Sequence, residues 1–150
     1  KNALAAGLVV AFSVCFSDGL STEEALMKYM TLAKDTGVHF VQFLEPKAIG
    51  HYKNKSVELS KESIQNIESF FLKMNFGKQC TDFPLISYHG YYQRRVGCLS
   101  AGKRAMYITA DGHLNACPFC QKSYGNLLEG SIEEKVKKMS NSGCPSFASL

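Results

Sequence analysis

The strongest structural signal in the sequence is Tyr107-Ile-Thr-Ala-Asp-Gly-His-Leu-Asn-Ala-Cys117-Pro-Phe-Cys120. Two short segments, 105–110 and 113–117, flank Asp111-Gly112, and this dipeptide favours a tight β-hairpin turn because glycine accepts a positive φ. The second segment leads directly into a Cys-x-x-Cys turn. The sequence therefore predicts a hairpin that presents the thiols of Cys117 and Cys120 at its far end.

Two further cysteines flank the hairpin, Cys98 before it and Cys144 after it. Eighteen residues separate Cys98 from Cys117, and twenty-three separate Cys120 from Cys144. A Cys-x-x-Cys turn lets two thiolates reach one metal centre, and the flanking segments can bring the other two. We therefore interpret the four cysteines as candidate ligands of one metal or iron–sulfur site.

The spacing leaves the identity of the metal open. Structural zinc sites also use four cysteines, but usually as two Cys-x-x-Cys knuckles, and only one knuckle is present here. The single outer ligands favour an iron–sulfur cluster over zinc. Disulfides and buried free thiols remain alternatives. Cys15 and Cys80 lie in unrelated settings and are interpreted as ordinary thiols.

The first half of the chain predicts parallel strands. The apolar runs 8–16 and 38–44 have the composition of strands buried on both faces. Between them, Ser21-Thr-Glu-Glu24 is a capping box that opens a helix, and Gly37 ends it. Strand, helix and strand in this order form a βαβ unit, in which the two strands are parallel.

These signals divide the chain into three parts. Residues 1–77 form the α/β part, in which Ser60 caps a second long helix. Residues 78–97 have no clean period and are expected to be an irregular connector. Residues 98–150 form the cysteine module, in which a short helix follows the hairpin and is capped by Ser131-Ile-Glu-Glu134.

Ligands of parallel α/β folds bind beyond the carboxyl ends of the strands. In this chain the corresponding loops follow Phe16 and Leu44, and the second loop contains Glu45 and His51. Both side chains are candidates for a ligand contact. A loop carboxylate and a solvated histidine are the simpler interpretations.

Composition narrows the class of protein. The chain has 150 residues, of which 45% are hydrophobic, so it can build an ordinary core. Its net charge is +4 and no run of five like charges occurs, which argues against a nucleic-acid-binding tail. No apolar run reaches the ~18 residues of a membrane span. The cysteine pattern differs from that of a small secreted domain, so we expect a reduced, cytoplasmic compartment.

The residues that carry these signals resemble a known family. Thirteen residues separate Cys98 from Gly112 and four separate Gly112 from Cys117. This spacing resembles the opening of the SPASM and twitch modules of radical S-adenosylmethionine enzymes, which bind auxiliary [4Fe–4S] clusters. Tyr124-Gly-Asn-Leu-Leu-Glu-Gly-Ser-Ile-Glu-Glu134 is similar to the segment that follows their hairpin. Residues 8–44 resemble the fifth and sixth strands of the partial (β/α)6, TIM-like barrel of this family.

The resemblance covers nearly the whole chain and implies a fold and a site. The fold is α/β: the last βα units of the partial barrel, followed by a small module of β-hairpin plus helix. Cys98 and Cys117 match the hairpin cysteines of the family, whereas Cys120 and Cys144 are our own assignment for the remaining ligands. Three residues at the end of the second strand and in the loop after it would line the adenosine pocket: Gln42, Leu44 and Ile49.

The family's Cys-x-x-x-Cys-x-x-Cys motif, which holds the cluster that cleaves S-adenosylmethionine, is absent from the sequence. By resemblance, this second [4Fe–4S] cluster would lie in a missing N-terminal barrel half, so we expect the chain alone to be inactive. Four cysteines fit the single-cluster twitch form better than the seven-cysteine SPASM form. The implied partners are a peptide or protein substrate and an electron donor such as flavodoxin or ferredoxin. A non-enzymatic zinc or iron–sulfur module, and an α/β domain with incidental cysteines, are the alternatives.

Overall fold

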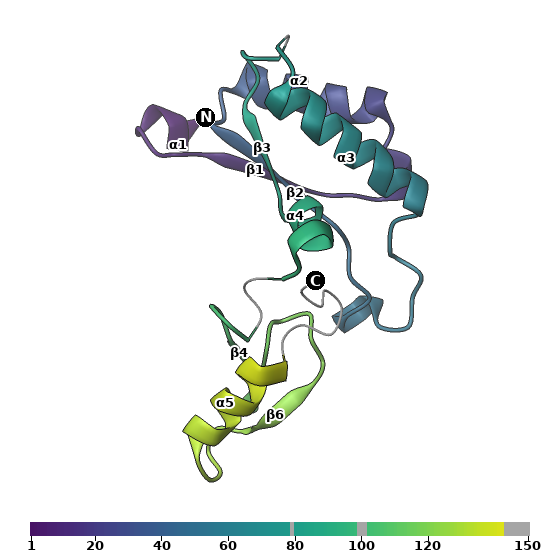
Figure 1. The fold of residues 1–150 in the computed structure, drawn as a ribbon. Coiled ribbons are helices and arrows are strands. Elements are labelled where there is room, and N and C mark those ends of the chain that lie inside the picture. The colour runs from purple at the N-terminus through teal and green to yellow at the C-terminus, as the bar shows by residue number, and fades with distance from the viewer. Residues whose placement is uncertain (79, 99–101, 143–150) are drawn as a thin grey trace. The chain divides into compact units, whose positions relative to one another are not determined.

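The computed structural model describes residues 1–78, 80–98 and 102–142 (Figure 1). The chain divides into two compact units, residues 1–91 and residues 92–150. Each unit contains its own three-stranded sheet and its own hydrophobic core. The chain is therefore a mixed α/β protein.

The first unit is built on a parallel sheet. Its strands are β1 (Ala11–Cys15), β2 (Phe40–Leu44) and β3 (Leu85–Tyr88), in the order β1-β2-β3. Ala11 of β1 is opposite Phe40 of β2, which in turn is opposite Leu85 of β3. The predicted βαβ unit and its parallel pairing are confirmed, and β3 adds a third strand.

Two long helices cover one face of this sheet, as Figure 1 shows: α2 (Glu23–Thr36) and α3 (Lys61–Phe76). The core between helices and sheet is formed by buried apolar side chains, among them Leu26, Met30, Ala33, Val41, Phe43, Ile67, Phe70, Phe71, Met74 and Ile86. The helix ends follow local rules: Ser60 Oγ accepts a hydrogen bond from the Ser63 N–H (3.1 Å), and Gly37 ends α2 at φ 81°. Both of these signals were predicted.

The shorter elements among residues 1–96 are α1 (Asn2–Ala5), two 3₁₀ turns, η1 (Asp18–Leu20) and η2 (Gly50–Tyr52), and α4 (His89–Val96). No helix in the described part of the chain is long and apolar enough to cross a membrane.

The face of the sheet opposite the helices is open among the described residues. Burial along β2 alternates: Val41 and Phe43 are buried, whereas Phe40 and Leu44 are 38% and 37% exposed. Leu85 of β3 is 65% exposed on the same open face. The prediction that the first two strands are buried on both faces is therefore wrong for this unit. An apolar run has the same composition whether or not a second layer covers it.

The cap of α2 lies one residue later than predicted. Thr22 Oγ1 accepts from the Ala25 N–H (3.3 Å), whereas Ser21 is buried and lies 2.7 Å from both the Asp18 carbonyl and Ser63 Oγ. Ser21 thus ties η1 to the start of α3 and does not provide the side-chain cap of α2.

The expectation of an irregular connector after α3 is also wrong, because that segment contains β3 and α4. The side chain of Asn75, at the end of α3, holds β3 in place. Its Nδ2 donates to the Ile86 carbonyl (2.8 Å) and its Oδ1 accepts from the Ile86 N–H (2.9 Å). A strand of only four residues is too short to show a clear alternation of apolar and polar side chains. The side chain that holds it belongs to α3, so the sequence of the strand did not reveal it.

The second unit contains the predicted hairpin. Its strands are β4 (Tyr107–Ile108), β5 (His113–Asn115) and β6 (Ser123–Asn126), all antiparallel, with β5 in the centre. Gly112 has φ 85° in the turn between β4 and β5, as the Asp-Gly signal predicts. Helix α5 (Ile132–Ser142) packs against β5 and β6, and Ser131 Oγ accepts from the Glu134 N–H (3.3 Å). Strand β6 was not predicted.

Packing of α3 on the parallel sheet gives a first prediction. Ile67 is fully buried, so Ile67→Ala should lower the free energy of unfolding by about 2–5 kcal/mol through the cavity that it leaves. Leu72→Ala on the same helix is the control, because Leu72 is 39% exposed and its truncation should cost less than about 1 kcal/mol. Urea unfolding of the two variants checks this, and equal losses would contradict the assigned helix face.

Candidate functional site

Three of the four predicted ligand cysteines lie in the described part of the second unit, and Cys144 lies outside the described residues. Cys120 is 8% exposed and belongs to the core of this unit. Cys98 and Cys117 are half-buried and pack against the same core. The fold therefore brings Cys98 to the same small core as the Cys117–Cys120 turn.

The Cys-x-x-Cys turn is fixed by backbone and side-chain hydrogen bonds. The Cys120 N–H donates to the Cys117 carbonyl (3.1 Å) and closes the turn. The Asn115 amide, in β5, donates from Nδ2 to the Cys120 carbonyl (2.8 Å) in a buried setting. Gln93 Nε2 lies 3.9 Å from Cys98 Sγ. The turn is thus held against the central strand, which is the kind of support that a thiol ligand pair needs.

In residues 1–78, 80–98 and 102–142, no three side chains of His, Cys, Asp or Glu are grouped closely enough to hold a metal ion. The three described thiols therefore share a core without forming a three-ligand centre among themselves. Their chemistry still fits an iron–sulfur cluster or zinc, because both prefer soft thiolate ligands.

Two buried polar atoms near these cysteines have no hydrogen-bond partner in the described structure: Asn115 Oδ1 and the Tyr124 hydroxyl. Asn115 is 7% exposed and Tyr124 is 6% exposed. Buried polar groups are almost always paired, so these two atoms are exceptions among the described residues. Sequence analysis missed both residues. The signal that could have found Asn115 is a polar residue within the predicted strand, two residues before Cys117.

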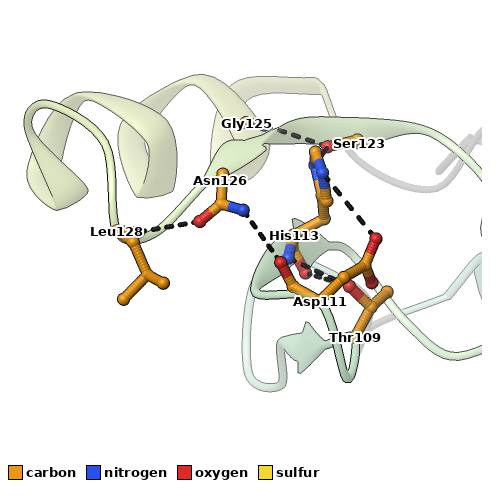
Figure 2. Close-up of polar contacts among 7 residues, drawn as sticks. All are labelled: Thr109, Asp111, His113, Ser123, Gly125, Asn126 and Leu128. Atoms are coloured by element: carbon orange, nitrogen blue, oxygen red, sulfur yellow. Dashed lines mark hydrogen bonds and ion pairs between the residues drawn. The ribbon is translucent and has the colours of Figure 1, made fainter.

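Polar side chains also meet around the hairpin turn, as Figure 2 shows. His113 Nδ1 lies 2.9 Å from Ser123 Oγ, and its Nε2 lies 3.9 Å from Asp111 Oδ2. Asn126 donates from Nδ2 to the Asp111 carbonyl (2.8 Å) and accepts at Oδ1 from the Leu128 N–H (2.9 Å). These contacts connect the β4–β5 turn to β6 and to the loop after it.

The residue types Ser123, His113 and Asp111 are those of a hydrolase triad, but the geometry is not. In such triads His Nε2 faces the serine and Nδ1 faces the carboxylate, whereas here the two ring nitrogens have the opposite partners. Ser123 Oγ also accepts from the Gly125 N–H (3.1 Å). The arrangement therefore stabilises the turn, and we assign it no catalytic role.

In the first unit, Gln42 and Leu44 lie on the open face of β2. The Ser13 hydroxyl donates to Gln42 Oε1 (3.1 Å) across that face. Ile49 is half-buried in the loop after β2. Because β3 follows β2 in the sheet, the last parallel strand of this unit is β3. The resemblance takes β1 and β2 as the fifth and sixth strands of the barrel, so it does not account for β3.

Glu45 occupies the carboxyl end of β2, with a side chain that is only 12% exposed. The Tyr88 hydroxyl, at the end of β3, donates to Glu45 Oε1 (2.6 Å), and Lys47 Nζ lies 3.8 Å from Oε2. A Cβ atom at Gly90 would overlap Oε1, so the missing side chain of Gly90 makes room for the carboxylate. Glu45 therefore joins the ends of two neighbouring strands. His51, the other loop candidate, is exposed in η2.

The close approach of Gly90 to Glu45 gives a second prediction. Gly90→Ala should lower the free energy of unfolding by about 1–2 kcal/mol, because the new methyl group displaces the carboxylate from the Tyr88 hydroxyl. Gly19→Ala is the control, since its Cβ would meet nothing within 4 Å. Urea unfolding measures both variants, and a Gly90→Ala variant as stable as the control would show that the carboxylate moves without cost.

The electrostatics of the hairpin turn give a third prediction. The Thr109 hydroxyl, a backbone N–H and the nearby His113 lower the pKa of the Asp111 carboxyl. Its contribution to stability is therefore complete above the unfolded-state pKa of about 3.9 and is lost as the pH falls through the lower folded-state pKa. Asp111→Asn should lower Tm at neutral pH, and its difference from the unchanged chain should shrink in acid.

Thermal unfolding between pH ~7 and pH ~3 tests this expectation. Asp35→Asn, which removes an exposed carboxylate from α2, controls for the change in net charge. A Tm difference for Asp111→Asn that stays constant over this range would contradict the role assigned to the carboxylate.

Comparison with known proteins does not assign the chain to a family. No protein-family model matches the chain, and no curated protein matches it. The functional argument for this chain therefore depends on its own residues and on the motif resemblance that they carry.

Proposed function

We propose that this chain is the C-terminal part of a radical S-adenosylmethionine enzyme, and that its second unit binds an auxiliary [4Fe–4S] cluster. One observation supports the proposal above all: Cys98, Cys117 and Cys120 share one core, at the far end of a hairpin with the spacing of twitch modules. Cys144 is the proposed fourth ligand. When bound, such a cluster would supply a site for electron transfer or for substrate binding.

The residues around the thiols have defined roles in this proposal. Asn115 holds the carbonyl of Cys120 and so fixes the direction in which the turn presents its thiols. Leu114 and Met139, which are fully buried, exclude water from the side of the thiols that faces the core. Binding would draw the thiols closer together than they lie in the described structure, and it would release their protons.

The small core of the second unit supports a ligand with a structural role. Its buried residues are Leu114, Ala116, Cys120, Tyr124 and Met139. A core of this size supplies little stability, and small domains commonly add metal ions for that reason. This observation also favours the second candidate function, a non-enzymatic zinc or iron–sulfur module in which the cysteines only stabilise the fold.

The open sheet of the first unit supports the barrel part of the proposal. Parallel sheets are normally covered on both faces, yet one face of β1, β2 and β3 is open among the described residues. The proposed partner is the N-terminal barrel half, which would also hold the second cluster and S-adenosylmethionine. Gln42 and Leu44 lie on that open face, where the adenosine pocket is proposed, with Ile49 in the adjoining loop. A peptide or protein substrate and a flavodoxin or ferredoxin complete the set of proposed partners.

Anaerobic purification followed by iron, sulfide and zinc analysis tests the proposal. About four irons and a broad visible absorption would support the cluster. One zinc in a colourless protein would support the structural module instead. A protein that binds no metal, even after chemical reconstitution, would contradict both candidates.

Single serine substitutions give a fourth prediction. Replacing Cys98, Cys117, Cys120 or Cys144 should each lower the iron bound after reconstitution, because each removes one proposed ligand. Cys15→Ser is the matched control, since Cys15 is an exposed cysteine of β1 in the other unit. Iron content and visible absorption measure the effect. Full iron content in all four variants would refute the ligand set.

A further inference from the structure

The backbone of the Cys117–Cys120 turn has the shape that a disulfide between its two ends needs. The Cys120 N–H donates to the Cys117 carbonyl (3.1 Å), so these four residues form a hydrogen-bonded β-turn. The first and last Cα atoms of a β-turn lie less than about 7 Å apart. Disulfides join cysteines whose Cα atoms are about 4.4–6.8 Å apart. A bond between these two sulfurs therefore requires little movement of the backbone.

The turn is held in this shape before any bond forms. Pro118 occupies its second position, where the proline ring fixes φ at about −65°. The Asn115 amide donates from Nδ2 to the Cys120 carbonyl (2.8 Å) and ties the last residue of the turn to β5. Because the backbone is already ordered, closing a disulfide here costs little conformational entropy.

The side chains of the two cysteines contact the same core but differ in accessibility. Cys120 is 8% exposed and belongs to the core, whereas Cys117 is half-buried and packs against it. Pro118 and Phe119, which lie between them, are exposed. A small molecule in solution therefore reaches Cys117 more easily than Cys120.

The other described cysteines are less suited to bridge with this pair. Cys15 and Cys80 lie in the first unit. Cys98 packs against the same core as the turn, but eighteen residues separate it from Cys117. Closing that longer loop costs more entropy than closing the turn.

We propose that Cys117 and Cys120 form a reversible disulfide by exchange with a small-molecule disulfide such as oxidised glutathione. The Cys117 thiolate attacks one glutathione sulfur, which forms a mixed disulfide and releases one glutathione thiolate. The Cys120 thiolate then attacks Cys117 Sγ, and the bond from Cys117 to glutathione breaks. The two released glutathione thiolates take up the two protons that the cysteines lose. The chain is oxidised by two electrons, and the glutathione disulfide is reduced by the same two.

This disulfide does not depend on the proposed function, but one consequence of it does. A metal ligand must be a thiolate, and a sulfur in a disulfide is not one. If the proposed function holds, oxidation removes two of the four proposed ligands. The loading of the site with metal is then controlled by the thiol–disulfide balance around the protein.

Peptide mapping of the metal-free chain after incubation with oxidised glutathione tests the proposal. Trypsin cuts after Arg104 and Lys122 and releases a peptide, 105–122, whose only cysteines are Cys117 and Cys120. Mass spectrometry should show that this peptide has lost two hydrogens, and that dithiothreitol restores them. In concentrated urea the bond should form at least about ten-fold more slowly, because the turn is then no longer ordered.

Serine variants test the order of the two steps. Cys120→Ser should accumulate glutathione on Cys117, because the second thiolate is missing. Cys117→Ser should accumulate it on Cys120 at least about ten-fold more slowly, because Cys120 is buried. Cys15→Ser is the matched control and should form the disulfide at the unchanged rate, since Cys15 lies in β1 of the other unit.

The possible results separate this inference from the proposed function. A bridge to Cys98 or Cys144, an unmodified peptide 105–122, or equal rates in buffer and urea would overturn the inference. A chain that forms the disulfide but binds no metal when reduced would contradict only the proposed function. If the reduced chain binds iron or zinc, the oxidised chain should bind less, and dithiothreitol should restore the loss. Equal metal content in the two forms would overturn the redox control of loading.

Discussion

The second unit depends on the register of its central strand, β5. Each of its three residues makes a different contact, since His113 meets Ser123 of β6, Leu114 fills the core, and Asn115 holds the Cys117–Cys120 turn. Because side chains alternate along a strand, a shift of one residue would misplace all three at once. The Asp-Gly turn and the hydrogen bond from Asn126 to the Asp111 carbonyl oppose such a shift. The position of the Cys117–Cys120 turn therefore depends on how β5 pairs with its neighbouring strands.

Elements with local signals could be predicted, and elements with distant partners could not. The hairpin follows from Asp111-Gly112, and the start of α3 follows from Ser60, because turns and caps involve residues a few positions apart. Strand β3 depends on Asn75 and on pairing with β2, whose paired residues lie 45 positions earlier in the chain. The one-sided burial of the sheet depends on which layers are present, and no residue pattern encodes that.

The same distinction between local signals and distant partners applies to the candidate site. Spacing alone selected the four cysteines as candidate ligands, because ligand spacing can be read from the sequence. The unpaired atoms of Asn115 and Tyr124 were missed, because only the folded chain shows that these atoms are buried and lack partners. Glu45 was a candidate from its place after β2. Its partner Tyr88 belongs to a strand that the sequence did not reveal.

The contact between Glu45 and Gly90 has a consequence for the evolution of this fold. A side chain at position 90 and a carboxylate at position 45 would compete for the same space. Lineages that acquire a larger residue at one position must therefore change the other, and the two positions should vary together among descendants. A single steric exclusion thus couples two residues that lie forty-five positions apart, and it would leave a record in any set of diverged sequences.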